Sequence, residues 1–202
     1  ARAAGPPAAG GPGAGSAALQ HIVVLMQENR SFDSYFGALH REGQPASEAE
    51  PPTGIAGVHL FHQSANCEVS DLNHEWTGTH REVDGGRMDG FLTQNRVPGD
   101  PGGRRAMGYY DASDLPYYYR LATTFGIGDR YFASVPGPTF PNRFYSLAGT
   151  SFGHTDNDAP PKGGFTQPTI FGRLQQAGIS WAVYEAQVPV AMAFADVQAH
   201  PD

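Results

Sequence analysis

Runs of apolar residues separated by polar junctions divide the chain into predicted strands and helices. The run from Ile22 to Met26 is continuous and rich in β-branched residues, which is typical of a buried parallel strand. The runs at 129–135 and 179–185 predict a second and a third buried strand. A further short strand is predicted near 58–61, within a long region of few periodic signals.

Segments with helical spacing lie between these apolar runs. The first helix is predicted to follow residue 31 and to stop at Gly37. Further helices are predicted at 114–126, 139–149 and 169–178, each ending at a glycine. Alternating strands and helices predict an α/β fold, with a mainly parallel sheet flanked by helices.

The composition of the chain limits the classes of protein to which it can belong. The 202 residues carry a formal net charge of −7 with a pI near 5.5, which argues against a general nucleic-acid binder. Residues 1–19 are rich in Ala, Gly and Pro and are predicted to be a disordered tail, which leaves 20–202 as the folded part. The single cysteine, Cys67, cannot form an intramolecular disulfide, so cysteine content does not indicate whether the protein works in an oxidising or a reducing compartment.

The first candidate site lies at the end of the first predicted strand. Glu28 and Asn29 follow it directly, at the sheet edge where open α/β folds bind ligands. A carboxylate beside an amide oxygen suits a hard divalent cation. Turn and capping roles explain these two residues equally well on spacing alone.

Two histidines flank a tryptophan in the segment 71–80. His74 and His80 are six residues apart, so they converge only if the chain turns around Trp76. Imidazole suits a phosphate site as a hydrogen-bond donor, an acid or a metal ligand. The alternative is that both are ordinary surface or packing residues.

The third candidate is the helix start after the second predicted strand. Thr139 is placed there as the expected N-cap, where free backbone amides and the helix dipole stabilise phosphate oxygens. Asn142 and Arg143 add an amide and a guanidinium that suit a phosphate clamp, and His154 follows in a glycine-rich loop. A helix-cap threonine is ordinarily no more than a cap.

Several stretches together go beyond generic chemistry. The chain resembles the bacterial phosphoesterase family of phosphatidylcholine-type phospholipases C and acid phosphatases, which shares the alkaline-phosphatase/sulfatase-like fold. The matching stretches are IVVLMQENRSFDSYFG (22–37), DLNHEWTGTH (71–80), GGRMDGF (85–91), DLPYYYRLATTFGIGDRYFASVPGPTFPNRFYSLAGTS (114–151) and TIFGRLQQAGISWAVYE (169–185).

The resemblance implies roles for the candidate residues. Glu28, Asn29 and Thr139 match metal-binding positions for a divalent ion of unknown identity, and Thr139 also matches the nucleophile that forms a phospho-enzyme. A catalytic histidine in the phosphate pocket matches His80 best, and His74 is the second choice. We group Asn142, Arg143 and His154 as substrate-binding residues.

The implied activity is metal-dependent hydrolysis of phosphate esters, with a phospholipid or a small phosphate ester as substrate. A phospholipase C in transient contact with a membrane surface is favoured, and a phosphomonoester-cleaving acid phosphatase is the alternative. Family habit and the Ala/Gly/Pro-rich tail predict a secreted or periplasmic protein.

One departure from the family pattern adds a third hypothesis. The family supplies further metal ligands from Asp-Glu and Asp-His pairs, and this sequence contains neither dipeptide. We therefore expect the N-terminal portion of a longer catalytic domain, or else a divergent short form of the enzyme. The third hypothesis is an inactive or incomplete fragment that binds phosphate esters without turnover.

Overall fold

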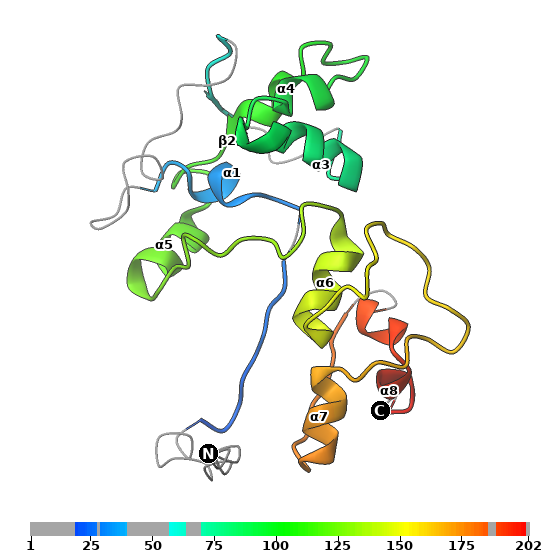
Figure 1. The fold of residues 1–202 in the computed structure, drawn as a ribbon. Coiled ribbons are helices and arrows are strands. Elements are labelled where there is room, and N and C mark those ends of the chain that lie inside the picture. The colour runs from blue at the N-terminus through cyan, green and yellow to red at the C-terminus, as the bar shows by residue number, and fades with distance from the viewer. Residues whose placement is uncertain (1–18, 28, 40–56, 64–69, 186–188, 201–202) are drawn as a thin grey trace, which may run out of the picture.

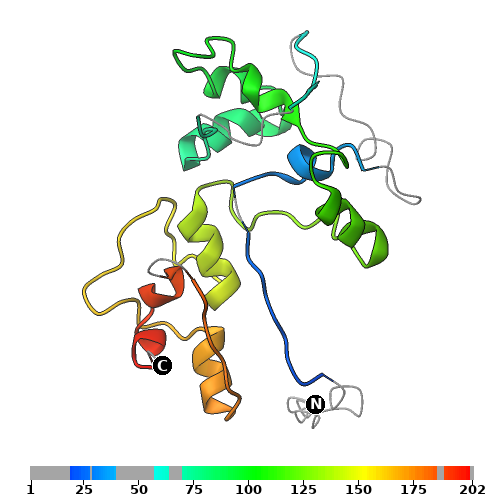
Figure 2. The same ribbon diagram turned by 180° about the vertical axis from the view of Figure 1, so that it is seen from behind.

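The computed structural model describes residues 19–27, 29–39, 57–63, 70–185 and 189–200. Helices α1, α3, α4 and α5 gather in one group, and α6, α7 and α8 form a second (Figures 1 and 2). The elements, with 3-10 helices labelled η, are α1 (Phe32–Phe36), β1 (Phe61–His62), α3 (Trp76–Val83), η2 (Asp84–Gly86), α4 (Phe91–Gln94), η3 (Arg104–Met107), β2 (Gly108–Tyr109), α5 (Pro116–Thr124), α6 (Thr139–Ala148), α7 (Ile170–Gln176), η4 (Val190–Ala193) and α8 (Ala195–Gln198).

A small apolar core joins α1 to α5. Helix α1 begins where the Ser31 side chain accepts a hydrogen bond from the Ser34 amide. Its last residue, Phe36, lies with its ring centroid 5.7 Å from that of the buried Tyr119 on α5. The Tyr110 amide donates to the Ser34 carbonyl at 2.8 Å, which fixes the chain after β2 against α1.

The sheet of the described residues is a parallel pair of short strands. β1 and β2 pair with Phe61 opposite Gly108 and His62 opposite Tyr109. The Gln63 amide extends the ladder by donating to the Tyr109 carbonyl at 2.8 Å. The short strand predicted near 58–61 is therefore confirmed at its carboxyl end.

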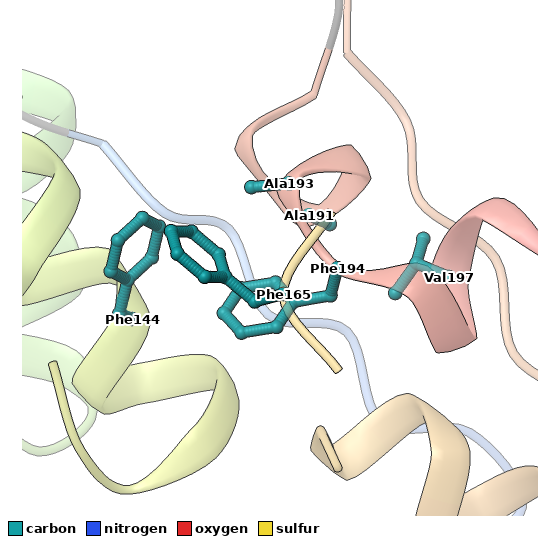
Figure 3. Packing of buried hydrophobic residues seen from close by; sticks show 6 residues of the cluster. All are labelled: Phe144, Phe165, Ala191, Ala193, Phe194 and Val197. Carbon is teal, nitrogen blue, oxygen red and sulfur yellow. The ribbon is translucent and has the colours of Figure 1, made fainter. Parts of the chain in front are cut away.

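The second group of helices encloses the larger apolar core (Figure 3). Phe144 on α6 and Phe194 ahead of α8 are 1% and 0% exposed, with ring centroids 5.4 Å apart. Phe165 completes the aromatic cluster and exchanges backbone hydrogen bonds with the carbonyl of Ala193 and the amide of Ala195. This core fixes α6, the helix that begins at Thr139.

The four predicted helices are present, although two of the predicted caps differ. α5 begins after Leu115 rather than after Asp114, because the Asp114 carboxylate bonds to His62 and to the Asp111 amide instead. α6 has Pro138 as its N-cap, so Thr139 is its first helical residue rather than its cap. α7 begins at the Thr169 cap as a helix start signal predicts.

The three long strands predicted at 22–26, 129–135 and 179–185 are wrong for this structure. The first and the third of these segments have no regular secondary structure, and the second contains only bends and turns. Most of their apolar side chains are exposed: residues 22–25 are 79–88% exposed, Tyr131 90% and Tyr184 93%, whereas Trp181 and Val183 pack against the larger core. In Figures 1 and 2 residues 19–27 run away from the helices. An apolar run favours a strand only where a neighbouring backbone pairs with it, and none of the described residues does so here.

The fold class is accordingly confirmed at a coarse level. Helices and a small parallel sheet are consistent with α/β, whereas an alkaline-phosphatase-like core is not established by two short strands. The predicted tail, residues 1–19, lies outside the described residues except for Leu19, and Cys67 lies outside them as well.

Candidate functional site

The segment that follows residue 70 brings two of the candidate residues together. Asn29 has a left-handed backbone, with φ of 70°, and its Nδ2 donates to Asp71 Oδ1 at 3.1 Å. The other oxygen of Asp71 lies 3.5 Å from His74 Nδ1. Asp71 therefore joins Asn29 to His74, and because the Asn29 amino group is engaged, its Oδ1 is left as the acceptor.

The His74 ring is oriented by its own backbone. Its Nδ1 lies 2.8 Å from the Leu72 carbonyl, which can only accept a hydrogen bond, so Nδ1 carries a proton. In the neutral ring Nε2 is then the free acceptor.

Buried polar groups hold residues 70–73 in place. The Arg105 side chain, 10% exposed, donates to the Ser70 and Asp71 carbonyls at 3.3 and 3.0 Å and also to the Asn95 carbonyl. Asn95 is 2% exposed and its Oδ1 accepts from the Asn73 amide at 2.7 Å. These residues come from α4, η3 and the turn between them, so the local packing positions Asp71.

A buried carboxyl group completes this scaffold on α3. Glu82 is 6% exposed, and its Oε1 accepts from Asn95 Nδ2 at 2.7 Å. Burial raises the pKa of the Glu82 carboxyl, and the Asn95 hydrogen bond and the charge of His74 oppose that rise. A shallow depression of about 380 Å³ opens over the scaffold, lined by Asp71, Leu72, Asn73, His74, Glu75, Gln94, Val97 and Arg105.

Trp76 connects this segment to the start of α6. Its ring centroid lies 4.1 Å from that of His80, whose Nδ1 donates to the Trp76 carbonyl at 2.7 Å. Trp76 also packs against Gly137, where an added Cβ would lie 3.2 Å from Trp76 Cε3. Only Pro138 separates Gly137 from Thr139, so the histidine segment lies next to the predicted nucleophile's loop.

The loop before Thr139 is braced by Asn142. The Asn142 Oδ1 accepts from the Val135 amide, and its Nδ2 donates to the carbonyls of Val135, Gly137 and Pro138, all at 3.0–3.1 Å. The side chain thus holds the loop in shape. Its predicted contact with substrate stays a prediction.

The loop at 150–164 covers the same helix start. Asn157 Oδ1 accepts from the Phe140 amide at 2.8 Å, which satisfies one of the free donors of the first turn of α6. The His154 ring lies 5.1 Å from the Phe165 ring, and its Nδ1 is 3.6 Å from Asp158 Oδ2. His154 therefore packs on the core edge, while Arg143 is half-buried on α6.

The structure brings together part of the predicted site. Asn29 and His74 are joined through Asp71, and His80 stacks on the tryptophan that contacts the loop before Thr139. Glu28 lies outside the described residues, so its predicted place beside Asn29 stays a prediction.

Sequence reasoning missed two features of this region. The first is Asp71, which was identified from the sequence only as part of a matched stretch. Its hydrogen bond to Asn29 spans 42 residues, and a local sequence pattern cannot predict such a contact. The second is a group of three donors, His62, Asp111 and Asp114, whose ligand atoms lie within 4.8 Å of one another. The hydrogen bond to Asp114 raises the pKa of His62, and the Ser113 hydroxyl and amide lower that of Asp111.

Comparison with known proteins finds relatives that are named phospholipase C. The chain is 33% identical over 193 residues to the hemolytic phospholipase C of Pseudomonas aeruginosa, covering 83% of the chain and 26% of that relative. It is 34% identical over 200 residues to phospholipase C B of Mycobacterium tuberculosis, covering 83% and 38%. It is also 34% identical over 198 residues to the non-specific phospholipase C4 of Arabidopsis thaliana, covering 85% and 37%.

The chain thus spans between about a quarter and two fifths of the length of these relatives. None of the helices in the described part of the chain has the length and apolar character needed to cross a membrane. The model of the Phosphoesterase family matches residues 19–201, and the chain belongs to that family.

Proposed function

We propose that the protein hydrolyses phosphate esters as a phospholipase C, which cleaves the phosphodiester of a phospholipid on its glycerol side. The observation that carries this proposal is the convergence of three segments that are distant in sequence. Asn29 meets His74 through Asp71, and Trp76 packs two residues ahead of Thr139. Membership of the Phosphoesterase family and relatives named phospholipase C support it.

The proposed chemistry is a pair of displacements at phosphorus. The Thr139 hydroxyl loses its proton to solvent, its oxygen attacks phosphorus, and the bond from phosphorus to the glycerol oxygen breaks. His80 gives a proton to that leaving oxygen, with His74 as the second candidate acid. Water then attacks the phosphothreonine, which releases the head-group phosphate and restores the hydroxyl.

A divalent ion fits the donor set of this site. Glu28, Asn29 and Thr139 would hold it through a carboxylate, an amide oxygen and a hydroxyl, and Asn29 Oδ1 is the oxygen that its bond to Asp71 leaves available. When bound, such an ion makes a hydroxyl more acidic and polarises a phosphoryl oxygen. The start of α6 adds backbone amides and a positive dipole end beside the phosphate.

A second candidate function is phosphate-ester binding without turnover. It is favoured by the ligand count, since Glu28, Asn29 and Thr139 give three donors where divalent ions in oxygen sites take about six. The proposal also includes a secreted or periplasmic location and transient contact with a membrane surface. The membrane contact follows from the proposed lipid substrate, and the location follows from family habit and the Ala/Gly/Pro-rich composition of residues 1–19.

Thr139 variants test the proposal directly. Thr139→Ala removes the nucleophile, so we expect hydrolysis of phosphatidylcholine vesicles to fall about 1,000-fold or more, and Thr139→Ser to retain part of it. The measurement is release of phosphocholine in the presence of a divalent ion, with p-nitrophenyl phosphate as the monoester comparison. Acid quenching should trap phosphocholine on residue 139, detected by mass spectrometry.

The outcomes separate the candidate functions. Faster turnover of the monoester than of the lipid supports an acid phosphatase. Saturable vesicle or phosphocholine binding, with no activity that Thr139→Ala removes, supports the binding fragment and rejects the enzyme.

A further inference from the structure

Two chain segments that the proposed mechanism does not use bring three ligand side chains together. His62 lies at the end of β1, and its Nε2 is 2.6 Å from Asp114 Oδ2 and 3.7 Å from Asp111 Oδ2. All three ligand atoms lie within 4.8 Å of one another. Among the interactions of the described residues, none joins this trio to Asn29, His74 or Thr139.

Strand pairing and local hydrogen bonds place the three ligands. The parallel register sets His62 opposite Tyr109, two residues before Asp111. The Asp111 Oδ1 accepts from the amide and hydroxyl of Ser113 at 2.7 and 2.6 Å, so its Oδ2 turns towards the imidazole. The Asp111 amide donates to Asp114 Oδ2 at 2.9 Å, and the Asp114 side chain is only 10% exposed.

The spacing suits one ion. With ligand bonds of about 2.1 Å, neighbouring donors around a tetrahedral or octahedral ion lie about 3.0–3.4 Å apart. The distances of 2.6 and 3.7 Å from His62 Nε2 bracket that range. A simple ion pair would need only one carboxylate, whereas here a second one, from Asp111, faces the same nitrogen at a distance too long for a hydrogen bond.

We propose that His62, Asp111 and Asp114 form a divalent-cation site separate from the predicted catalytic one, suited to a transition ion such as Zn²⁺ or Mn²⁺. An imidazole nitrogen with two carboxylate oxygens favours these ions over Mg²⁺ and Ca²⁺, which prefer oxygen ligands alone. The bound ion ties the parallel strand pair to the start of α5, because its ligands come from β1 and from the turn that precedes that helix.

Cobalt titration of the full chain tests this site. Co²⁺ serves as the probe because its visible absorption bands report nitrogen and oxygen ligation. A Cys67→Ser background removes the single thiol. We expect Asp111→Asn and His62→Gln each to weaken Co²⁺ binding about 100-fold or more, since even outer-shell changes cost 10–100-fold. Asp111→Asn keeps the oxygen that accepts from Ser113, so the turn is preserved.

Two further variants test whether Co²⁺ binding is specific to this site. Asp158→Asn changes a comparable histidine–aspartate pair, for which the described residues supply no third donor, and should leave Co²⁺ affinity unchanged. Asn29→Ala removes a ligand of the predicted catalytic site and should also leave these bands in place. Wild-type Co²⁺ affinity in both Asp111→Asn and His62→Gln overturns the proposal, and so does loss of the bands in Asn29→Ala alone.

Discussion

At the scale of single residues, the candidate site depends on the close contact between Gly137 and Trp76. Gly137 lies against Trp76, and the same loop is held by four hydrogen bonds from Asn142. The loop and the histidine segment therefore share one interface. A side chain at 137 would separate them, without touching a proposed catalytic group.

We expect Gly137→Ala to reduce turnover more than stability. Its Cβ would lie 3.2 Å from Trp76 Cε3, so the tryptophan must shift by a few tenths of an ångström, at a cost of about 1 kcal/mol. The measurements are kcat on phosphatidylcholine vesicles and the thermal unfolding midpoint. Gly126→Ala is the matched control, because nothing lies within 4 Å of a Cβ there. Equal activities of the two variants would remove the contact from the proposed mechanism.

The buried Glu82 predicts a pH dependence of stability. Because burial raises the pKa of Glu82 above 4.5, the folded state prefers the protonated carboxyl. Its contribution to stability is full below the unfolded pKa and is lost as the pH rises through the folded pKa. Glu82→Gln keeps an oxygen for Asn95 and does not titrate, so the variant should gain stability relative to wild type as the pH rises from 4 to 7.

Urea unfolding at several pH values between 4 and 7 measures this difference. Glu75→Gln is the control, since this exposed side chain ends the loop before α3. A Glu82→Gln advantage that stays constant across the range would contradict the assigned effect of burial.

At the scale of elements, the ends of helices carry specific contacts. Thr169 is 1% exposed, and its Oγ1 accepts from the Gly172 amide while its hydroxyl and amide both donate to Asp196 Oδ2. One side chain therefore caps α7 and joins it to α8. Thr169 therefore links α7 and α8 next to the larger apolar core.

Thr169→Ala should lower the free energy of unfolding by about 2 kcal/mol, because it removes a cap and leaves Asp196 with one donor fewer. Thr169→Ser keeps the hydroxyl and should lose about 0.8 kcal/mol, mainly through the missing buried methyl group. Chemical denaturation of both variants gives the comparison. Indistinguishable losses would show that packing of the methyl group, rather than the hydrogen bonds, stabilises this junction.

Helices were predictable from the sequence because their signals are local. Caps, spacing and terminal glycines lie within the element itself, and α1, α5, α6 and α7 all formed near the predicted positions. Strands were not, because the runs at 22–26, 129–135 and 179–185 need a distant partner that no local pattern supplies. The same holds for the site: Asn29 and His74 were predicted singly, whereas Asp71 and the His62 trio required the folded chain.

At the scale of the whole molecule, the segments that were predicted as strands expose apolar side chains to solvent. Ile22, Val23, Tyr131 and Tyr184 are each more than four fifths exposed. Soluble monomers rarely show large contiguous apolar patches, and unpaired extended segments also present free backbone groups. The two cores pack the helices, and the segment 179–185 reaches the larger core through Trp181 and Val183, but the four side chains named above lie outside both cores.

This surface predicts self-association of the 202-residue chain. Extended apolar segments from different copies can pair through their backbones and bury side chains such as Val24, which is 79% exposed. Sedimentation velocity across a range of concentrations should therefore show growing assemblies, and an apolar fluorescent dye should bind. Val24→Glu should reduce both signals because it places a charge within the pairing segment. Gln20→Glu adds the same charge at an exposed polar position and should have a smaller effect. A monomer at every concentration, with no dye bound, would mean that these segments fold against the rest of the chain in solution.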